Sequence, residues 1–204
     1  MEKSSSEARI PQSIADSIAV KQAILDNPDF MARIQLAADR MVESLCSGGK
    51  IHFCGNGGSA ADAQHLAAEL SGRFYFDRPP LNAEALHCNT SYLTSVANDY
   101  GYDEVYARML RGTAKKGDVL VAISTSGNSR NILNAIEMAK TMGVKVIAMT
   151  GESGGAMRDV ADILLNVPST DTPRIQESHI MIGHILCELV ESRIFAECAS
   201  GFLR

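Results

Sequence analysis

Tryptophan is absent from the 204 residues, aromatic residues make up 5%, and proline occurs six times. No segment approaches the ~18 consecutive apolar residues of a membrane-spanning helix, and residues 1–12 lack the apolar core of a signal peptide. An excess of basic residues is also lacking, because the net charge is −5 with both signs interspersed. A general nucleic-acid surface needs a basic patch, so we expect neither nucleic acid nor a membrane as a partner.

Cysteine is scarce and unpaired in its pattern. The five cysteines are an odd number and form no C-x-x-C motif. That pattern favours reduced thiols in a cytoplasmic protein, mostly buried as small apolar side chains. The residues are Cys46, Cys54, Cys88, Cys187 and Cys198.

Short apolar runs alternate with helical stretches from residue 51 onward. Strands alternating with helices pair in parallel and are covered on both faces. The sequence therefore predicts an α/β fold with a doubly wound, mostly parallel five-stranded sheet flanked by helices. The predicted strands are 51–54, 83–87, 118–123, 144–149 and 163–167.

Helices are expected at both ends of the chain. Residues 1–9 are interpreted as a loose tail, and Ser13 as the cap of a helix that ends near Asp26. A second helix is predicted from about residue 27 to 47, with Pro28 in its first turn. We expect one domain over 1–204, with N-terminal helices in 1–50 and the sheet and C-terminal helix in 51–204.

The final helix is unusually apolar. Thr172 is its predicted cap and Pro173 its first residue, and it is expected to run to about Ala199. Apolar residues occupy more than one face, which is typical of a helix buried on several sides. This pattern predicts burial against other subunits.

Two small-residue loops each follow a predicted strand and precede a helix. The first is Gly55-Asn56-Gly57-Gly58-Ser59, and the second is Ser124-Thr125-Ser126-Gly127-Asn128-Ser129. Glycines let the backbone approach a ligand, and a helix start offers unpaired N–H groups to an anion. Each loop alone could be an ordinary capped turn. Two at the carboxyl ends of strands favour a phosphate site, because open α/β sheets bind ligands there.

A dinucleotide site is the competing interpretation of the first loop. Gly55-x-Gly57-x-x-Ala60 fits the relaxed fingerprint, which also requires an acidic residue at the end of the next strand. Glu84 falls at the start of that strand instead. The serine-rich loop would also remain unexplained, so we expect no nucleotide cofactor.

Polar side chains that suit acid–base chemistry lie on two predicted helices. His65 and Glu69 are four residues apart after the first loop, so they share a helix face. The apolar final helix carries a second polar set, and buried polar groups need partners. Taken singly, His65 and Glu69 are better explained as a helix-surface pair, and His184 as a satisfied core histidine. The second set is Gln176, Glu177, His179 and His184.

Three motifs together resemble the sugar isomerase (SIS) family. They are G-N-G-G-S-A-A-D-A-Q-H-x-A-A-E-L-x-G-R-F from residue 55, A-I-S-T-S-G-N-S from residue 122, and R-I-Q-E-x-H-x-x-x-x-H from residue 174. The third is similar to that of the phosphoheptose isomerase branch. The resemblance implies conversion of sedoheptulose 7-phosphate to D-glycero-D-manno-heptose 7-phosphate through an enediol, the first step toward the ADP-heptose of the lipopolysaccharide core. It also implies a homotetramer with active sites near subunit contacts.

The resemblance also implies roles for particular residues. Glu69 would be the general base and His184 its acid–base partner. Zinc, one ion per subunit, would bind the equivalents of His65, Glu69, Gln176 and His184. The substrate would contact Asn56, Gly57, Gly58, Ser59, Glu69, Asn98, Asp99, Ser124, Thr125, Ser126, Ser129 and Gln176.

Two observations bear on these implied roles. Pro173 stands where some members have an acidic residue, which removes one expected sugar contact. On a straight helix Gln176 and His184 are about 12 Å apart in rise and point about 80° away from each other. A common ion would therefore need an irregular helix, long reach or ligands from different subunits.

Two non-enzymatic alternatives belong to other functional classes. A relative of the family that binds the bacterial replication initiator lacks the catalytic carboxylate and second histidine, whereas this chain has Glu69 and His184. A sugar-phosphate sensor of a transcription regulator would carry a helix-turn-helix domain. Residues 1–50 have no cluster of arginine and lysine that would suit a recognition helix.

Overall fold

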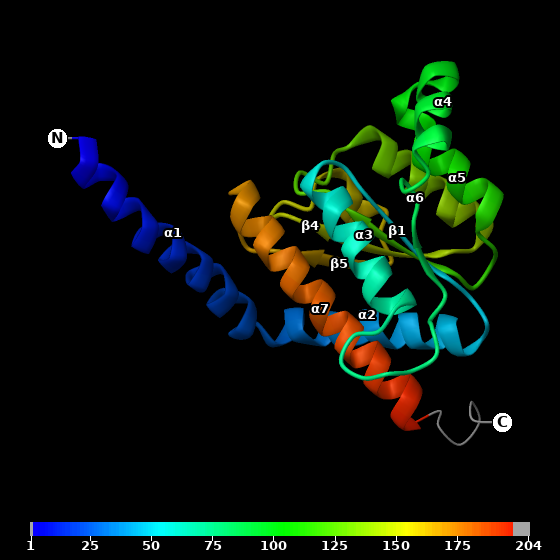
Figure 1. Ribbon diagram of the computed structural model, residues 1–204, viewed down its shortest axis with the longest axis horizontal. Coiled ribbons are helices and arrows are strands. Elements are labelled where there is room, and N and C mark those ends of the chain that lie inside the picture. The colour runs from blue at the N-terminus through cyan, green and yellow to red at the C-terminus, as the bar shows by residue number, and fades with distance from the viewer. Residues whose placement is uncertain (1, 198–204) are drawn as a thin grey trace.

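A parallel sheet of five strands forms the centre of the structure, a computed structural model that describes residues 2–197 (Figure 1). The strands pair in the order β2-β1-β3-β4-β5, and every pairing is parallel. The predicted doubly wound α/β fold is confirmed, and each strand begins within one residue of its predicted start. The strands are β1 (Ile51–Gly55), β2 (Ala83–Ala85), β3 (Val119–Ile123), β4 (Lys145–Thr150) and β5 (Ile163–Asn166).

Helices cover both faces of the sheet, and two short 3-10 helices lie in the connections (Figure 1). The α-helices are α1 (Glu2–Leu25), α2 (Pro28–Cys46), α3 (Gly58–Ser71), α4 (Thr90–Tyr100), α5 (Val105–Thr113), α6 (Arg130–Met142) and α7 (Thr172–Glu197). The 3-10 helices are η1 (Tyr102–Glu104) and η2 (Gly155–Asp159).

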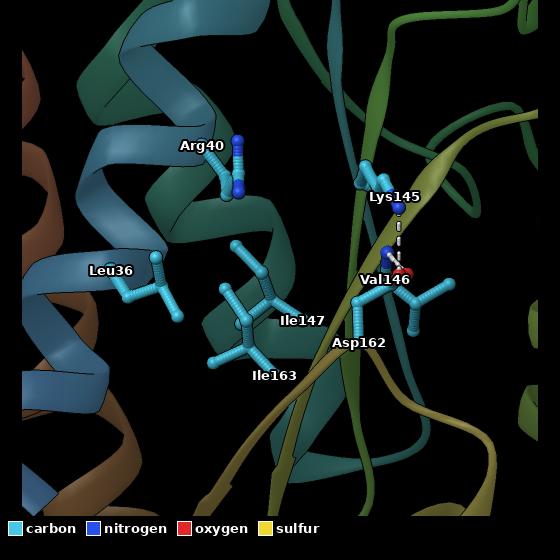
Figure 2. Close-up of a pocket in the computed structure, with 7 residues that line it drawn as sticks. All are labelled: Leu36, Arg40, Lys145, Val146, Ile147, Asp162 and Ile163. Carbon is cyan, nitrogen blue, oxygen red and sulfur yellow. Dashed lines mark hydrogen bonds and ion pairs between the residues drawn. The ribbon is translucent and has the colours of Figure 1, made fainter.

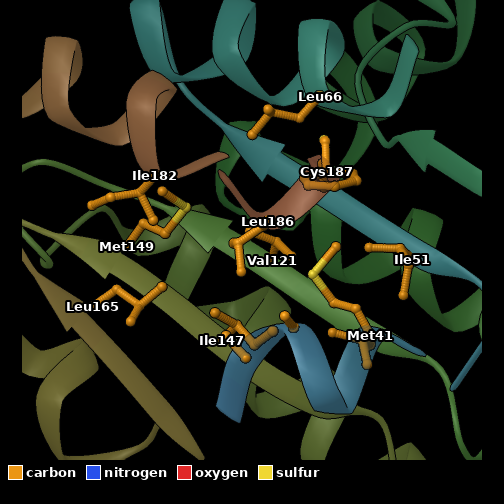
Figure 3. Close-up of a cluster of buried hydrophobic side chains, with 14 of the residues drawn as sticks. Met41, Ile51, Leu66, Val121, Ile147, Met149, Leu165, Ile182, Leu186 and Cys187 are labelled. Carbon is orange, nitrogen blue, oxygen red and sulfur yellow. The ribbon is translucent and has the colours of Figure 1, made fainter. Parts of the chain in front are cut away.

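Side-chain alternation along the strands builds an apolar cluster on each face. In β1, Ile51 and Phe53 point into one cluster and Cys54 into the other. Figure 3 shows the first cluster, where Leu66 of α3 and Leu186 of α7 pack over the sheet with residues of α2. The second cluster contains residues of α4, α5 and α6. Burial on both faces explains why the strands are nearly continuous apolar runs.

The sheet reverses its winding between β1 and β3. The chain leaves β1 toward β2 on one side and leaves β3 toward β4 on the other. Gly55 pairs with Ile123 at the carboxyl ends of these strands, so the two predicted phosphate loops start side by side. Open α/β sheets bind ligands at this reversal point.

The N-terminal helix differs from the prediction. α1 begins at Glu2 and passes through Pro11, so the predicted loose tail over 1–9 and the Ser13 cap are wrong. The segment has no apolar stripe, but Glu, Lys, Ala and Arg favour a helix without one. α1 projects from the rest of the chain in Figure 1 and leaves Ile14 and Ile18 57% and 60% exposed.

The other terminal predictions fared unevenly. Pro28 does open α2, and the side chain of Asn27 accepts a hydrogen bond from the Phe30 N–H at 3.0 Å. Thr172 is the first residue of α7 rather than its cap, because the carbonyl of Asp171 accepts the first intrahelical bond, from Ile175, at 2.9 Å. The predicted end of this helix at Ala199 lies outside the described residues.

The apolar faces of α7 are covered largely within the chain. Its most buried residues join the first cluster between the sheet, α2 and α3. The folded chain itself buries these residues, so they do not depend on other subunits for burial. The residues are Ile175, Ile182, Leu186, Cys187, Val190 and Ile194. Contact of the remaining faces of α7 with other subunits stays a prediction.

Cysteine burial was predicted only in part. Cys54 and Cys187 are buried, whereas Cys46 and Cys88 are exposed. Cys198 lies outside the described residues. Among the helices that the structure describes, none is long and apolar enough to cross a membrane.

Candidate active site

The first loop turns directly from β1 into α3. Gly57 caps the helix with a φ of 56°, a conformation that favours glycine. Ser59, in the first turn, is 4% exposed. A Cβ on Gly58 would lie 2.5 Å from Nε2 of Gln176, so the Gln176 amide of α7 packs directly on this loop. The first turn of α3 therefore places the positive end of the helix dipole at the sheet edge, as suits an anion. The N–H groups of Ser59 and Ala60 donate to the carbonyl oxygens of Asn56 and Gly57, at 3.0 and 3.1 Å.

The second loop gathers hydroxyl groups at the carboxyl end of β3. Oγ of Ser124 lies 2.9 Å from Oγ of Ser129 and 3.5 Å from Oγ of Ser126. Gly127 has a φ of +67°, and a Cβ there would lie 2.1 Å from the carbonyl oxygen of Gly154. The connection after β4 thus fixes the loop, whose converging hydroxyls suit the acceptor oxygens of a phosphate.

A pair of asparagine amides joins the two loops. Nδ2 of Asn56 donates to Oδ1 of Asn131 at 2.9 Å, and Nδ2 of Asn131 donates back to Oδ1 of Asn56 at 2.8 Å. The hydroxyl of Tyr102 also donates to Oδ1 of Asn56, at 3.3 Å. Asn131 was missed in the sequence, although a polar residue at a core-facing position of a predicted helix would have been a signal. The reciprocal bonds hold both loops in one arrangement.

A second polar cluster lies farther along α3, against α7. Nε2 of His65 is 3.0 Å from Oε1 of Glu69 and 3.2 Å from Nε2 of His184. The two imidazole ring centroids are 5.0 Å apart. Side-chain exposures of 48% for His65 and 27% for Glu69 leave the cluster accessible. The i,i+4 spacing thus brings together two predicted residues, and the packing of α3 on α7 adds His184.

The chemistry of this cluster follows from its donor atoms. One ligand atom from each of the three side chains lies within 4.8 Å of the others. A carboxylate and an imidazole in contact can remove and return protons. Two ring nitrogens that face each other near a carboxylate oxygen are also the donor set that zinc takes. The cluster therefore suits proton transfer and can hold a metal ion.

Asp62 lies one turn before His65 on the same helix. Its Oδ2 atom is buried without a hydrogen-bond partner. Burial raises the pKa of the Asp62 carboxyl to about 6, although the nearby charge of His65 acts in the opposite direction. This carboxyl therefore takes up a proton more readily than an ordinary aspartate.

Other predicted residues lie apart from this cluster. Gln176 touches Gly58, which precedes His65 by seven residues or about 10 Å of helix. Asn98 and Asp99 are exposed on α4 and hydrogen-bond to each other at 2.9 Å. Their contact with a sugar, and the metal role of Gln176, stay predictions.

His179 has a structural environment within the polar set of α7. It is fully buried, and its Nε2 lies 3.0 Å from the carbonyl oxygen of Thr150 at the end of β4. Burial lowers its pKa to about 4, although the Thr150 hydrogen bond acts in the opposite direction. His179 is therefore neutral at physiological pH.

A hollow at the opposite edge of the sheet does not belong to this site. Figure 2 shows it where β4 and β5 begin, facing Leu36 and Arg40 of α2. The Lys145 ammonium there pairs with Asp162 at 3.0 Å. The two loops, the Asn56–Asn131 pair and the cluster of His65, Glu69 and His184 all lie elsewhere. We therefore place the candidate site at the carboxyl ends of the strands and along α3.

Comparisons with known proteins agree with this geometry. The SIS domain family model matches residues 17–151. The phosphoheptose isomerase of Mycobacterium tuberculosis is 56% identical over 181 residues, which cover 89% of this chain and 92% of that protein. The Burkholderia pseudomallei phosphoheptose isomerase is 50% identical, covering 92% of this chain and 95% of that protein.

A solved structure supports the same relationship. The phosphoheptose isomerase of Neisseria gonorrhoeae superposes with a TM-score of 0.86 at 43% identity, covering 91% of this chain and 98% of that one. Sequence and structure agree over almost the whole length of these proteins. The chain therefore belongs to the SIS domain family and, within it, to the phosphoheptose isomerases.

Proposed function

We propose that this chain converts sedoheptulose 7-phosphate to D-glycero-D-manno-heptose 7-phosphate, an aldose–ketose isomerisation. The observation that carries the proposal is the convergence of His65, Glu69 and His184 in a chain of this family. A non-enzymatic regulator has no need of a carboxylate and two imidazoles in contact. In the cell, the product would feed synthesis of ADP-heptose for lipopolysaccharide, in the cytoplasm.

The reaction requires a proton to move between adjacent carbons. Glu69 would remove the carbon-bound proton, giving an enediol, and return it to the neighbouring carbon. His184 would exchange protons with the two oxygens, and a positioned acid or base of this kind contributes about 10²–10⁴-fold to rate. His65, 3.0 Å from Glu69, would orient the carboxylate.

The phosphate would bind between the two loops. The hydroxyls of Ser59, Thr125 and the serines of the second loop would donate to its oxygens, and the positive end of the α3 dipole would attract its charge. Asn56 would contribute mainly by holding the loop, since its amide is already bonded to Asn131. The remaining candidate contacts are Gly57, Gly58, Ser124, Ser126 and Ser129.

Zinc fits the donor atoms of His65, Glu69 and His184, which we call the catalytic cluster. His65, Glu69 and His184 would hold it, and a bound ion would supply a Lewis acid to polarise the substrate carbonyl. Gln176 would be a further ligand only to an ion held by another subunit, because its amide lies at Gly58.

We propose a homotetramer with active sites at the subunit contacts. A groove between α1, α2 and α7 is lined by apolar side chains, among them Leu25, Met31 and Met181. Ile18 also lines this groove, and Ile14 and Ile18 are both exposed on α1. Glu69 lies about 16 Å along α3 from Gly58, and this distance favours a site in which one subunit supplies the phosphate loops and another the acid–base pair.

Oligomeric state can be tested directly. Light scattering should give a tetramer, and replacing Ile14 and Ile18 together by glutamate should yield smaller species with lower activity. A wild-type monomer at micromolar concentration would contradict the proposal.

The activity test uses purified protein and sedoheptulose 7-phosphate, with the aldose product followed by NMR. Wild type should form the aldose, and Glu69→Gln should be about 10²–10⁴-fold slower. Glu137→Gln, an exposed change on α6, is the matched control and should be normal. Metal content is measured in each variant, because loss of zinc could mimic loss of the base. Normal turnover by a tetrameric, metal-replete Glu69→Gln protein would overturn the assignment.

A further inference from the structure

A buried ion pair lies just beyond the catalytic cluster and outside every residue considered so far. Nε of Arg78 donates to Oε1 of Glu191 at 2.8 Å, and the two side chains are 2% and 1% exposed. Arg78 lies in the connection 72–82 between α3 and β2, and Glu191 lies on α7. The pair therefore joins the two helices that carry the proposed acid–base groups.

The rest of the Arg78 guanidinium binds the end of α3. Its Nη2 atom donates to the carbonyl oxygen of Glu69 at 2.9 Å, and Nη1 donates to those of Leu70 at 2.7 Å and Gly72 at 3.0 Å. The last carbonyls of a helix lack intrahelical partners, and the end of its dipole attracts a cation. Arg78 thus fixes the backbone of Glu69 itself.

The Glu191 carboxylate fixes the connection in turn. Oε1 accepts a hydrogen bond from the Phe74 N–H at 3.0 Å, and Oε2 accepts one from the Tyr75 N–H at 2.8 Å. The ring of Phe74 then lies 5.7 Å from that of His184, centroid to centroid. One ion pair therefore contacts the backbone of Glu69 and also fixes the position of Phe74, whose ring packs on His184.

Burial of such a pair is not explained by stability alone. Removing two charges from water costs about as much as their attraction returns, and apolar replacements are often equally stable. Burial by itself would raise the pKa of Glu191, but the Tyr75 and Phe74 N–H groups and Arg78 lower it overall. The pair is therefore ionised at neutral pH.

We propose that Arg78 and Glu191 are positioning residues for the isomerisation, which hold the side chains of Glu69 and His184 at the correct distance and orientation to each other. This inference rests on the proposed function. Both residues act through the groups that they contact. The phosphate-binding loops lie at the opposite end of α3, so the pair does not touch them. Loss of the pair should therefore lower kcat much more than it raises KM.

The test is Arg78→Lys, which keeps the charge but loses the planar fork that spans several carbonyls. A misplacement of about 1 Å costs roughly 10²-fold in rate, so we expect kcat to fall about 10- to 100-fold, with KM nearly unchanged and a shifted pH profile of kcat. Arg193→Lys is the matched control, because Arg193 also lies on α7 but pairs with Asp39 of α2. A purely structural role predicts a lower Tm in Arg78→Lys with normal kcat, which would overturn the inference.

A second variant covers failure of Arg78→Lys to fold. Arg78→Met combined with Glu191→Gln removes both charges, so no unpaired charge is buried. A folded double variant with low kcat and normal KM supports positioning, and one with normal kcat refutes it. If neither variant folds, the pair is a requirement of the fold and the inference fails. Glu69→Gln, assayed in parallel, distinguishes failure of this inference from failure of the proposed function. Normal turnover of Glu69→Gln would refute the proposed function itself.

Discussion

Gly183 controls how closely α3 and α7 approach at the catalytic cluster. A Cβ at this position would lie 2.5 Å from both terminal methyls of Leu66 and 3.0 Å from its Cγ. Gly183 precedes His184 on α7, and Leu66 follows His65 on α3. A close contact of the two helices therefore lies next to the histidine pair.

The cost of Gly183→Ala can be worked out from this contact. Carbon atoms prefer about 3.5–4.0 Å, so Leu66 or the helices must move by about 1 Å. Overpacking costs about 1–3 kcal/mol, and the better helix propensity of alanine offsets about 1 kcal/mol, which leaves a net destabilisation of about 0–2 kcal/mol. A separation of the helices by this distance would move the 3.2 Å contact of His65 and His184 beyond hydrogen-bond range. We expect kcat to fall about 100-fold.

The assay compares kcat, KM and the denaturation midpoint of three variants. Gly112→Ala on α5 is the matched control, since a Cβ there would meet nothing within 4 Å. It should keep normal kcat and gain up to about 1 kcal/mol. Adding Leu66→Ala to Gly183→Ala removes the three atoms nearest to the new Cβ and should restore much of kcat while lowering stability. Normal kcat in folded Gly183→Ala, or no recovery in the folded double variant, would refute the reasoning.

Two further predictions concern phosphate binding and pH. Ser126→Ala and Ser59→Ala should each raise KM about 10- to 100-fold, as expected for a lost hydrogen bond to a charged group, with a smaller effect on kcat; unchanged KM in both would contradict the phosphate site. The pKa of His179 is lowered to about 4, so between pH 6.5 and 4 the unfolded chain takes up a proton that the folded chain refuses. This residue should therefore reduce the free energy of unfolding by about 2 kcal/mol between pH 7 and 5. His179→Gln should lack that part of the pH dependence in denaturant titrations at fixed protein concentration, and an identical slope in both proteins would contradict the assignment.

The fold was largely predictable because its signals are local. Apolar runs with turns at their ends located the strands of the sheet, and the small-residue loops marked the ends of β1 and β3. The error at α1 has a local cause as well. A polar segment without an apolar stripe was interpreted as a tail, whereas its helix propensity carries the helix from Glu2 through Pro11.

The site was predictable only where spacing alone determines contact. His65 and Glu69 meet because residues four apart share a helix face. Asn131 meets Asn56 across 75 positions, and Arg78 meets Glu191 across 113. Such pairs depend on which elements become neighbours in the fold, and neither residue of the ion pair carries a local signal that distinguishes it from a surface charge.

The parallel packing of α3 and α7 explains how residues distant in the sequence become neighbours. Gln176 contacts Gly58, Gly183 contacts Leu66, and Glu191 binds the segment that follows α3. The two helices thus advance together from the phosphate loops to the acid–base cluster and then to the ion pair. Because small residues set the spacing of the helices and the ion pair fixes their far ends, a change at either place should alter chemistry before it alters phosphate binding. If the polar residues of α7 had only a structural role, such changes would lower stability without this selective loss of kcat.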